Sequence, residues 1–225
     1  MLFLFKYIIV IFFGFTYSTF SIVAVDLTNG QIGSAGASCI GGSIIISDIH
    51  PGVGAIHTQS YWSGYNQIMA SNLMDSGLSP DEIIAYLIEN DVSNNPSIRQ
   101  YGIVDIYEGG RSAAYTGENC MDYKNHILGS NYAIQGNILL NEQVLMNIEN
   151  NFNSSIGTLS DKLMAALQGA NMPGADSRCL DNGTSSLSAF IRVAEPFDEA
   201  DDFFLDLNIN NTNNGQEPID LLQDL

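Results

Sequence analysis

The sequence predicts a single domain of the α+β class, in which antiparallel sheets are covered by layers of helices. Three observations lead to this class. The predicted elements follow the order three strands, two helices, three strands, two helices and two strands. Short turns join consecutive strands, which favours antiparallel pairing. No repeat of fixed period and no linker interrupts the chain, so one domain is expected over residues 19–225.

The first three predicted strands carry apolar or very small side chains. Residues 19–25 (TFSIVAV) form an apolar strand that ends at a turn over 26–30. Residues 31–39 return as a strand made almost wholly of glycine, alanine and serine. Such small side chains let another layer, or a substrate, approach the backbone closely. Residues 52–60 predict the third strand.

Capping residues and apolar periodicity mark the helices. The helix predicted over 65–76 gathers its apolar side chains on one face. The next helix begins at Ser79, followed by Pro80 at the first helical position and by Glu82, which completes a capping box. The remaining predicted elements are strands at 99–106, 111–116 and 131–137, helices at 142–152 and 158–168, strands at 185–193 and 203–208, and a short helical turn at 219–222.

Residues 1–18 have the pattern of a signal peptide. Lys6 closes a short segment with one positive charge, residues 7–15 are an uninterrupted apolar run, and Thr16 and Ser18 place small residues before the cleavage position. The run is shorter than the roughly 20 apolar residues that span a bilayer. We therefore expect cleavage between Ser18 and Thr19 and a secreted or periplasmic protein that does not contact the membrane afterwards. A retained membrane anchor is the alternative.

The charge of the chain excludes a nucleic-acid partner. The formal charge is −18, and it becomes −19 when Lys6 leaves with the signal peptide. Binding to phosphates needs clustered Lys and Arg, whereas the six basic residues that remain are scattered. The three cysteines allow at most one intramolecular disulfide, whose formation is permitted by export.

Common catalytic motifs are absent. The sequence contains no G-x-S-x-G elbow, no H-E-x-x-H and no phosphate-binding glycine loop. His50, His57 and His126 are too scattered to suggest a metal site, so we expect neither metal nor cofactor. His57 lies in an apolar strand, where a core or rim residue is the more common interpretation.

The predicted start of the mature chain offers the remaining chemistry. An N-terminal threonine carries a hydroxyl nucleophile and a free amine on one residue, and the amine serves as the general base. Its pKa of about 7.7–8.0 leaves a useful neutral fraction near pH 7. Thr19 is of the required type, follows the cleavage point directly and opens an apolar strand. A signal peptide that merely precedes a threonine is the alternative interpretation.

Six ordered segments resemble one protein family. They are TFSIVAVD (19–26), GVGAIHTQSY (52–61), RQYGIVD (99–105), AYTGENC (114–120), YAIQGN (132–137) and DSR (176–178). The chain looks like a member of domain of unknown function 1028, a family that resembles the N-terminal-nucleophile (Ntn) hydrolases. The match covers nearly the whole mature chain and is least clear after Val193. It implies a four-layer αββα sandwich, with Thr19 at the position that is exposed when the initiator methionine is removed from members that lack a signal.

The resemblance also implies roles for particular residues. Thr19 is the expected nucleophile. Asn137 closes a Gln-Gly-Asn segment similar to a family motif, so its side chain or a nearby backbone N–H is a candidate to stabilise an oxyanion. A turn that simply favours Gly-Asn is the alternative.

Four further residues are expected to bind substrate. Gln59 and Thr116 end strands that the implied fold brings near Thr19, although a structural role is an alternative for each. Asp176 and Arg178 are expected to orient the amine or to bind a substrate carboxylate. A surface turn with a local ion pair is the alternative.

The family comparison also suggests which cysteines pair. Most members carry no cysteine at the positions of Cys39 and Cys179, whereas the position of Cys120 commonly has one. A Cys39–Cys179 disulfide is therefore our hypothesis, and it ties the end of the second strand to the segment that contains Asp176.

The sequence thus predicts an exported amide-bond hydrolase that acts through Thr19 on a small amide or a peptide-like compound. The first alternative is a non-catalytic binding protein that uses a cleft beside the small-residue strand. A cell-surface structural protein is a second alternative, supported by the acidic, Asn-rich tail after Glu195. The sequence leaves open whether the protein forms a homo-oligomer.

Overall fold

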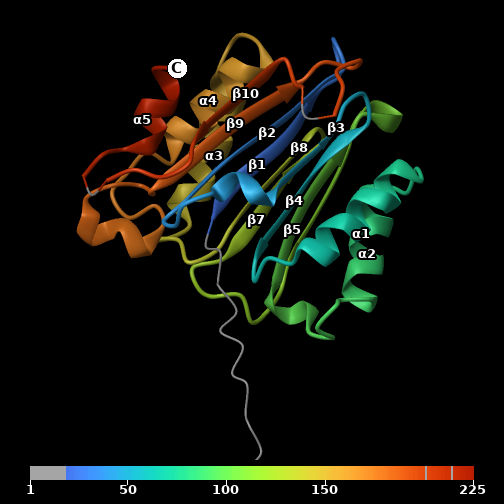
Figure 1. The fold of residues 1–225 in the computed structure, drawn as a ribbon, viewed down its shortest axis with the longest axis horizontal. Coiled ribbons are helices and arrows are strands. Elements are labelled where there is room, and N and C mark those ends of the chain that lie inside the picture. Colours follow the sequence, from blue (N-terminus) through green and yellow to red (C-terminus); the bar gives the residue numbers. More distant parts are fainter. Residues whose placement is uncertain (1–18, 201, 214) are drawn as a thin grey trace, which may run out of the picture.

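Two antiparallel sheets pack face to face, and helices cover the outer face of each (Figure 1). The computed structural model describes residues 19–200, 202–213 and 215–225, and the predicted signal peptide, residues 1–18, lies outside the described residues. The α+β sandwich predicted from the order of elements is confirmed.

The larger sheet has six strands in the order β10-β9-β2-β1-β8-β7. Its central position is occupied by β1, which pairs with β2 on one side and with β8 on the other. The strands are β1 (Phe20–Asp26), β2 (Gln31–Ser38), β7 (Asn125–Gly129), β8 (Tyr132–Gly136), β9 (Ser188–Ala194) and β10 (Leu205–Ile209).

The smaller sheet has four strands in the order β3-β4-β5-β6. They are β3 (Ser47–His50), β4 (Gly54–Ser60), β5 (Arg99–Asp105) and β6 (Arg111–Thr116). Strands β4 and β5 face β1, and β5 also faces β8, so the residues of these strands meet in the layer between the sheets.

The helices form two outer layers (Figure 1). Helices α1 (Gly64–Asp75) and α2 (Pro80–Glu89) cover the four-stranded sheet. Helices α3 (Gln143–Ser154) and α4 (Leu159–Gly169) cover the six-stranded sheet, and α5 (Pro218–Gln223) packs beside them on β9 and β10. The predicted capping boxes are present, since Ser79 pairs with Glu82 at α2 and Thr158 with Asp161 at α4.

The structure adds elements that the sequence did not predict. Strands β3 and β7 are absent from the prediction because each is short and lacks a clear apolar alternation. The strand predicted from residue 185 begins at Ser188 instead. Ser185 belongs to a loop, where its backbone N–H and its hydroxyl both donate to the carboxylate of Glu217.

The small residues of β2 allow the helix layer to approach closely. A Cβ added at Gly33 would meet the side chains of Leu163 and Leu159 on α4 at 2.5 and 2.9 Å. The sequence predicted that another layer or a substrate approaches the backbone of this strand closely. In the structure, α4 does so on the outer face of the sheet. In the described part of the chain, no helix is both long and apolar enough to cross a membrane.

A second glycine lies where the two sheets touch. A Cβ added at Gly102 of β5 would lie 1.8 Å from the side-chain oxygen of Gln135 on β8. The side chain of Gln135 is fully buried and donates hydrogen bonds to Ser21 and His57. Any side chain at position 102 must therefore displace Gln135 and break buried hydrogen bonds.

We predict that Gly102→Ala lowers the free energy of unfolding by about 1–3 kcal/mol, because it overpacks the layer between the sheets. Adding Gln135→Ala removes the steric conflict, so the double variant should lose less than the sum of the two single variants. Urea unfolding of the wild type and the three variants measures this coupling. Equal midpoints for Gly102→Ala and the wild type would contradict the packing described here.

Candidate active site

Thr19 directly precedes β1 and is fully buried at the end of the central strand. Its carbonyl oxygen accepts a hydrogen bond from the Gln59 side-chain amide at 3.2 Å and another from the Asn137 backbone N–H at 3.2 Å. The fold thus brings two of the predicted site residues into contact with Thr19. Their hydrogen bonds tie its main chain to both sheets, since Gln59 belongs to β4 and Asn137 follows β8.

Gln100 links the predicted residues to one another. Its side-chain oxygen accepts from Gln59 at 2.8 Å and from the Asn137 side-chain amide at 3.0 Å. Its nitrogen donates to the Thr116 hydroxyl at 2.9 Å. Gln100 is fully buried on β5, and sequence reasoning did not single it out. The available signal was a glutamine within a predicted strand (RQYGIVD), because a glutamine side chain requires polar partners when it is buried.

Thr116 is linked to Thr19 only indirectly. Its hydroxyl bonds to Gln100 and also lies 2.9 Å from Nδ1 of His126. Burial lowers the pKa of His126, which favours its neutral form. Gln59 therefore contacts Thr19 directly, whereas Thr116 contacts Gln100, which also accepts a hydrogen bond from Asn137.

Asp176 and Arg178 form an ion pair beside the end of β2. Nε and Nη2 of Arg178 donate to the two oxygens of Asp176 at 3.0 and 2.8 Å. The Asp176 carboxylate also accepts from the backbone N–H of Cys39 at 2.7 Å, and Arg178 Nη2 lies 3.4 Å from the hydroxyl of Ser38. Because Phe20 pairs with Ala37, Ser38 is the residue of β2 beside Thr19.

The two members of this ion pair differ in exposure. The Asp176 side chain is fully buried, whereas the Arg178 side chain is 29% exposed. The hydrogen bonds from Nε and Nη2 to the buried Asp176 carboxylate therefore fix the orientation of the Arg178 guanidinium. Such a preorganised guanidinium suits recognition of a carboxylate.

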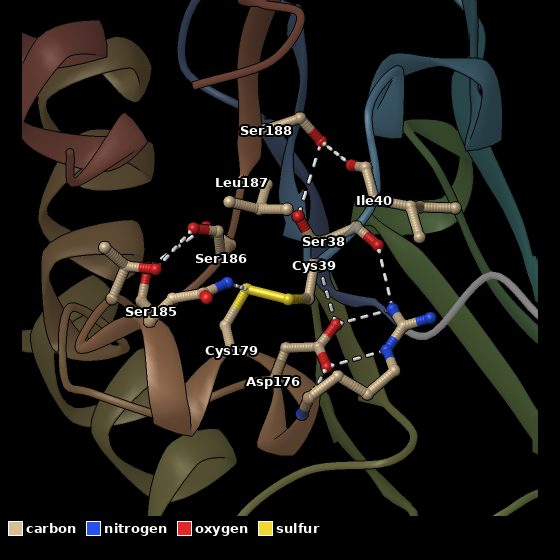
Figure 2. Close-up of a disulfide and its surroundings, with 12 residues drawn as sticks. Ser38, Cys39, Ile40, Asp176, Cys179, Ser185, Ser186, Leu187 and Ser188 are labelled. Carbon is tan, nitrogen blue, oxygen red and sulfur yellow. Dashed lines mark hydrogen bonds and ion pairs between the residues drawn. A yellow bond between two sulfur atoms is a disulfide. The ribbon is translucent and has the colours of Figure 1, made fainter. Parts of the chain in front are cut away.

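A disulfide joins Cys39 to Cys179 beside this ion pair (Figure 2), with a Cα–Cα distance of 5.6 Å. This is the pair proposed from the family resemblance. The bond ties the residue after β2 to the short 3-10 turn Ser177–Asn182, which contains Arg178. Cys120 is a free, buried thiol whose pKa is raised by burial.

A chain of buried hydrogen bonds continues from Thr19 through the layer between the sheets. Beyond Gln59, the Ser21 hydroxyl donates to the Gln59 side-chain oxygen at 2.7 Å, and Gln135 donates to Ser21 at 2.7 Å. Gln135 also donates to Nδ1 of His57 at 3.1 Å, so the His57 proton resides on Nε2, 2.6 Å from the Ser34 hydroxyl. His57 is thus a core residue, as interpreted from the sequence.

Burial and the nearby charge of Arg192 lower the pKa of His57 to about 3. The imidazole is therefore neutral at physiological pH. In the described part of the chain, no group of three or more His, Cys, Asp or Glu side chains is arranged to hold a metal ion.

Comparison with known proteins identifies relatives of the chain. The model of a family of unknown function, DUF1028, matches residues 19–221. The crystal structure of protein SPO2555 from Silicibacter pomeroyi, assigned to the same family, is similar with a TM-score of 0.75 and 23% sequence identity. The match covers 92% of this chain and 87% of that one, and it shows a shared fold. No curated protein matches the chain significantly.

We predict that the neutral, buried state of His57 makes the protein less stable as the pH falls below 6.5. The unfolded chain binds a proton at His57 near pH 6.5, whereas the folded chain does so only near pH 3. Unfolding therefore takes up a proton between these values, and His57 lowers the free energy of unfolding by up to about 1.4 kcal/mol per pH unit.

His57→Gln keeps a hydrogen-bond donor and an acceptor at this position, but the glutamine side chain does not take up a proton in this pH range. Urea unfolding at several pH values between 6.5 and 4 should therefore show a shallower loss of stability for the variant than for the wild type. Parallel slopes for the two proteins would show that His57 is not held neutral.

We predict that peptide mapping of the exported protein without reductant recovers Cys39 linked to Cys179 and Cys120 free. Loss of the bridge in a Cys39→Ser, Cys179→Ser variant should cost about 2–5 kcal/mol, because the bond closes a long loop in the unfolded chain. Cys120→Ser, which leaves the bridge intact, is the control. An intramolecular bridge to Cys120 would refute the pairing.

Proposed function

The chain belongs to DUF1028, a family whose function is unknown, and from its site we propose that it is an exported amide-bond hydrolase of the Ntn type. Removal of residues 1–18 makes Thr19 the first residue, with its hydroxyl as nucleophile and its own amine as general base. Residues 1–18 direct the chain to the exterior or the periplasm in this proposal.

The position of Thr19 is the observation that carries the proposal. It directly precedes the central strand of a two-sheet sandwich, and its carbonyl oxygen accepts hydrogen bonds from groups on both sheets. Fixing the main chain of the nucleophile in this way holds the hydroxyl and the amine in one geometry, which lowers the entropic cost of the reaction. The family match also begins at residue 19, where cleavage is predicted.

The proposed reaction proceeds through an ester on Thr19. The amine of Thr19 takes the hydroxyl proton while Oγ bonds to the carbonyl carbon of the substrate amide. The tetrahedral oxyanion then collapses, the C–N bond breaks, and the leaving nitrogen takes the proton from the ammonium group. Water then gives a proton to the amine as it attacks the resulting ester. The bond from the carbonyl carbon to Oγ breaks, Oγ takes the proton back from the ammonium group, and a carboxylic acid leaves, which restores Thr19.

The neighbouring residues have separate roles in this proposal. The Asn137 backbone N–H donates to the Thr19 carbonyl and its side-chain amide donates to Gln100. We assign the side-chain amide, which carries two N–H groups, to the stabilisation of the oxyanion. Gln59 holds the Thr19 carbonyl, and Thr116 acts through Gln100. Arg178, preorganised by Asp176, is assigned to a carboxylate of the substrate, which favours a small acidic amide or a peptide-like compound.

We predict that Thr19→Ala abolishes turnover of amide substrates found by screening the mature protein against an amide library. The substitution removes the nucleophile, whereas Thr19→Ser, which keeps a hydroxyl and an amine, should retain measurable turnover. Adding one residue before Thr19 should abolish turnover as well, because the adjacent nitrogen is then an amide without basicity.

Circular dichroism and thermal unfolding of each variant provide the control for folding. Normal turnover by the extended protein would refute the role of the Thr19 amine. If the wild type binds a compound from the library but hydrolyses none, the protein is a binding protein that keeps this fold.

A further inference from the structure

A cavity of about 450 Å³ lies at the opposite end of the sandwich from Thr19. It is lined by β3 and the turn that follows it, by α1, and by residues of β9 and the segment before β10. Strand β4 runs from Gly54 beside this turn to Gln59 at Thr19, a length of about 16 Å. The cavity is therefore separate from the candidate active site.

The unequal widths of the two sheets account for the cavity. The four-stranded sheet ends at β3, whereas the six-stranded sheet continues past β2 to β9 and β10. Arg192 of β9 lies on this overhanging part, beside Ser34 of β2, whose hydroxyl contacts Ser47 of β3 at 2.7 Å. A cationic side chain thus reaches the space beyond the edge of the smaller sheet.

Arg192 provides a positively charged wall that is only partly neutralised. Its Nη2 pairs with Asp206 at 3.0 Å, and its guanidinium carbon lies 4.7 Å from the centre of the Phe203 ring. Among the described residues, neither its Nε nor its Nη1 has a hydrogen-bond partner. The Arg192 side chain is only 12% exposed, so these donors are largely withheld from bulk water.

Asp48 and Asp75 provide a negatively charged wall. His50 lies between them, with Nδ1 2.7 Å from Asp75 and Nε2 3.6 Å from Asp48. Within the described residues, neither carboxylate pairs with a lysine or an arginine. Burial lowers the pKa of His50, but Asp48 and Asp75 raise it by more, so its pKa is above the usual value. The two carboxylates therefore create a local potential that favours a cation.

Apolar side chains also line the cavity. Ile49, Pro51, Val53 and Phe203 contribute the apolar part of the lining. The volume falls within the roughly 300–1,000 Å³ that small-molecule sites occupy. A ligand that carried only a cation would leave the Arg192 donors without an acceptor, and a ligand that carried only an anion would be repelled by Asp48 and Asp75.

We propose that this cavity binds a small zwitterion whose ammonium group and carboxylate are separated by a short apolar segment. The ammonium lies against Asp48 and Asp75, the carboxylate accepts from Arg192, and the apolar segment contacts Phe203 and its neighbours. The site is distinct from Thr19, so the proposal does not depend on the hydrolase activity.

Isothermal titration of the mature protein at pH 8, where His50 competes less for the carboxylates, tests the proposal with three probes. We expect 6-aminohexanoate to bind, and hexylamine and hexanoate, which each keep one charge, to bind at least about fivefold more weakly. Absence of 6-aminohexanoate binding at concentrations up to about 10 mM, or equal binding of a single-charge probe, would overturn the proposal.

Variants locate the bound zwitterion. Asp48→Asn and Arg192→Gln should each weaken 6-aminohexanoate binding at least about fivefold. Asp122→Asn, which makes the same charge change at a side chain that is 83% exposed and does not line the cavity, should leave binding unchanged, as should Thr19→Ala. Thermal unfolding shows whether Arg192→Gln is folded. If this variant does not fold, the binding measured with Asp48→Asn decides whether the proposal holds. Binding that is insensitive to Asp48→Asn would overturn the proposal.

Discussion

The carbonyl oxygen of Thr19 accepts one hydrogen bond from each sheet, and the arrangement of the site depends on this pair of contacts. The donors are themselves fixed, because Gln59 and Asn137 both donate to the side-chain oxygen of Gln100. In a buried layer every such amide needs partners, since an unsatisfied polar group costs about 1–3 kcal/mol. Because each of these buried amides needs a hydrogen-bond partner on the other sheet, the amides fix how the two sheets are placed relative to each other at the Thr19 end.

This polar layer restricts the residues around it. Gly102 lacks a side chain where Gln135 crosses between the sheets, and His57 stays neutral because it is fully buried beside a cation. On the outer face, the small residues of β2 let α4 pack against the strand next to β1. The disulfide and the Asp176–Arg178 pair complete the site, because they attach the turn at 177–182 to the end of β2.

The sequence was sufficient to predict most of the fold, because α2 and α4 begin with capping boxes and the central strand β1 is a continuous, largely apolar run. It was insufficient for β3 and β7, whose pairing is determined by neighbouring strands rather than by their own periodicity. The proximity of Gln59 and Asn137 to Thr19 followed from the family resemblance. The contacts of Gln100 could not be predicted from the sequence. They join β4, β5 and β8, which are distant from one another in the sequence.

The role of Thr19 is tested most directly by locating the group that a reactive electrophile modifies. The exported protein is treated with a β-lactone and digested, and mass spectrometry identifies the modified peptide. An adduct on a peptide that begins Thr-Phe-Ser-Ile, at Thr19 itself, is the result expected for an N-terminal nucleophile. An adduct confined to another residue, or a mature chain that begins elsewhere than Thr19, would contradict the mechanism.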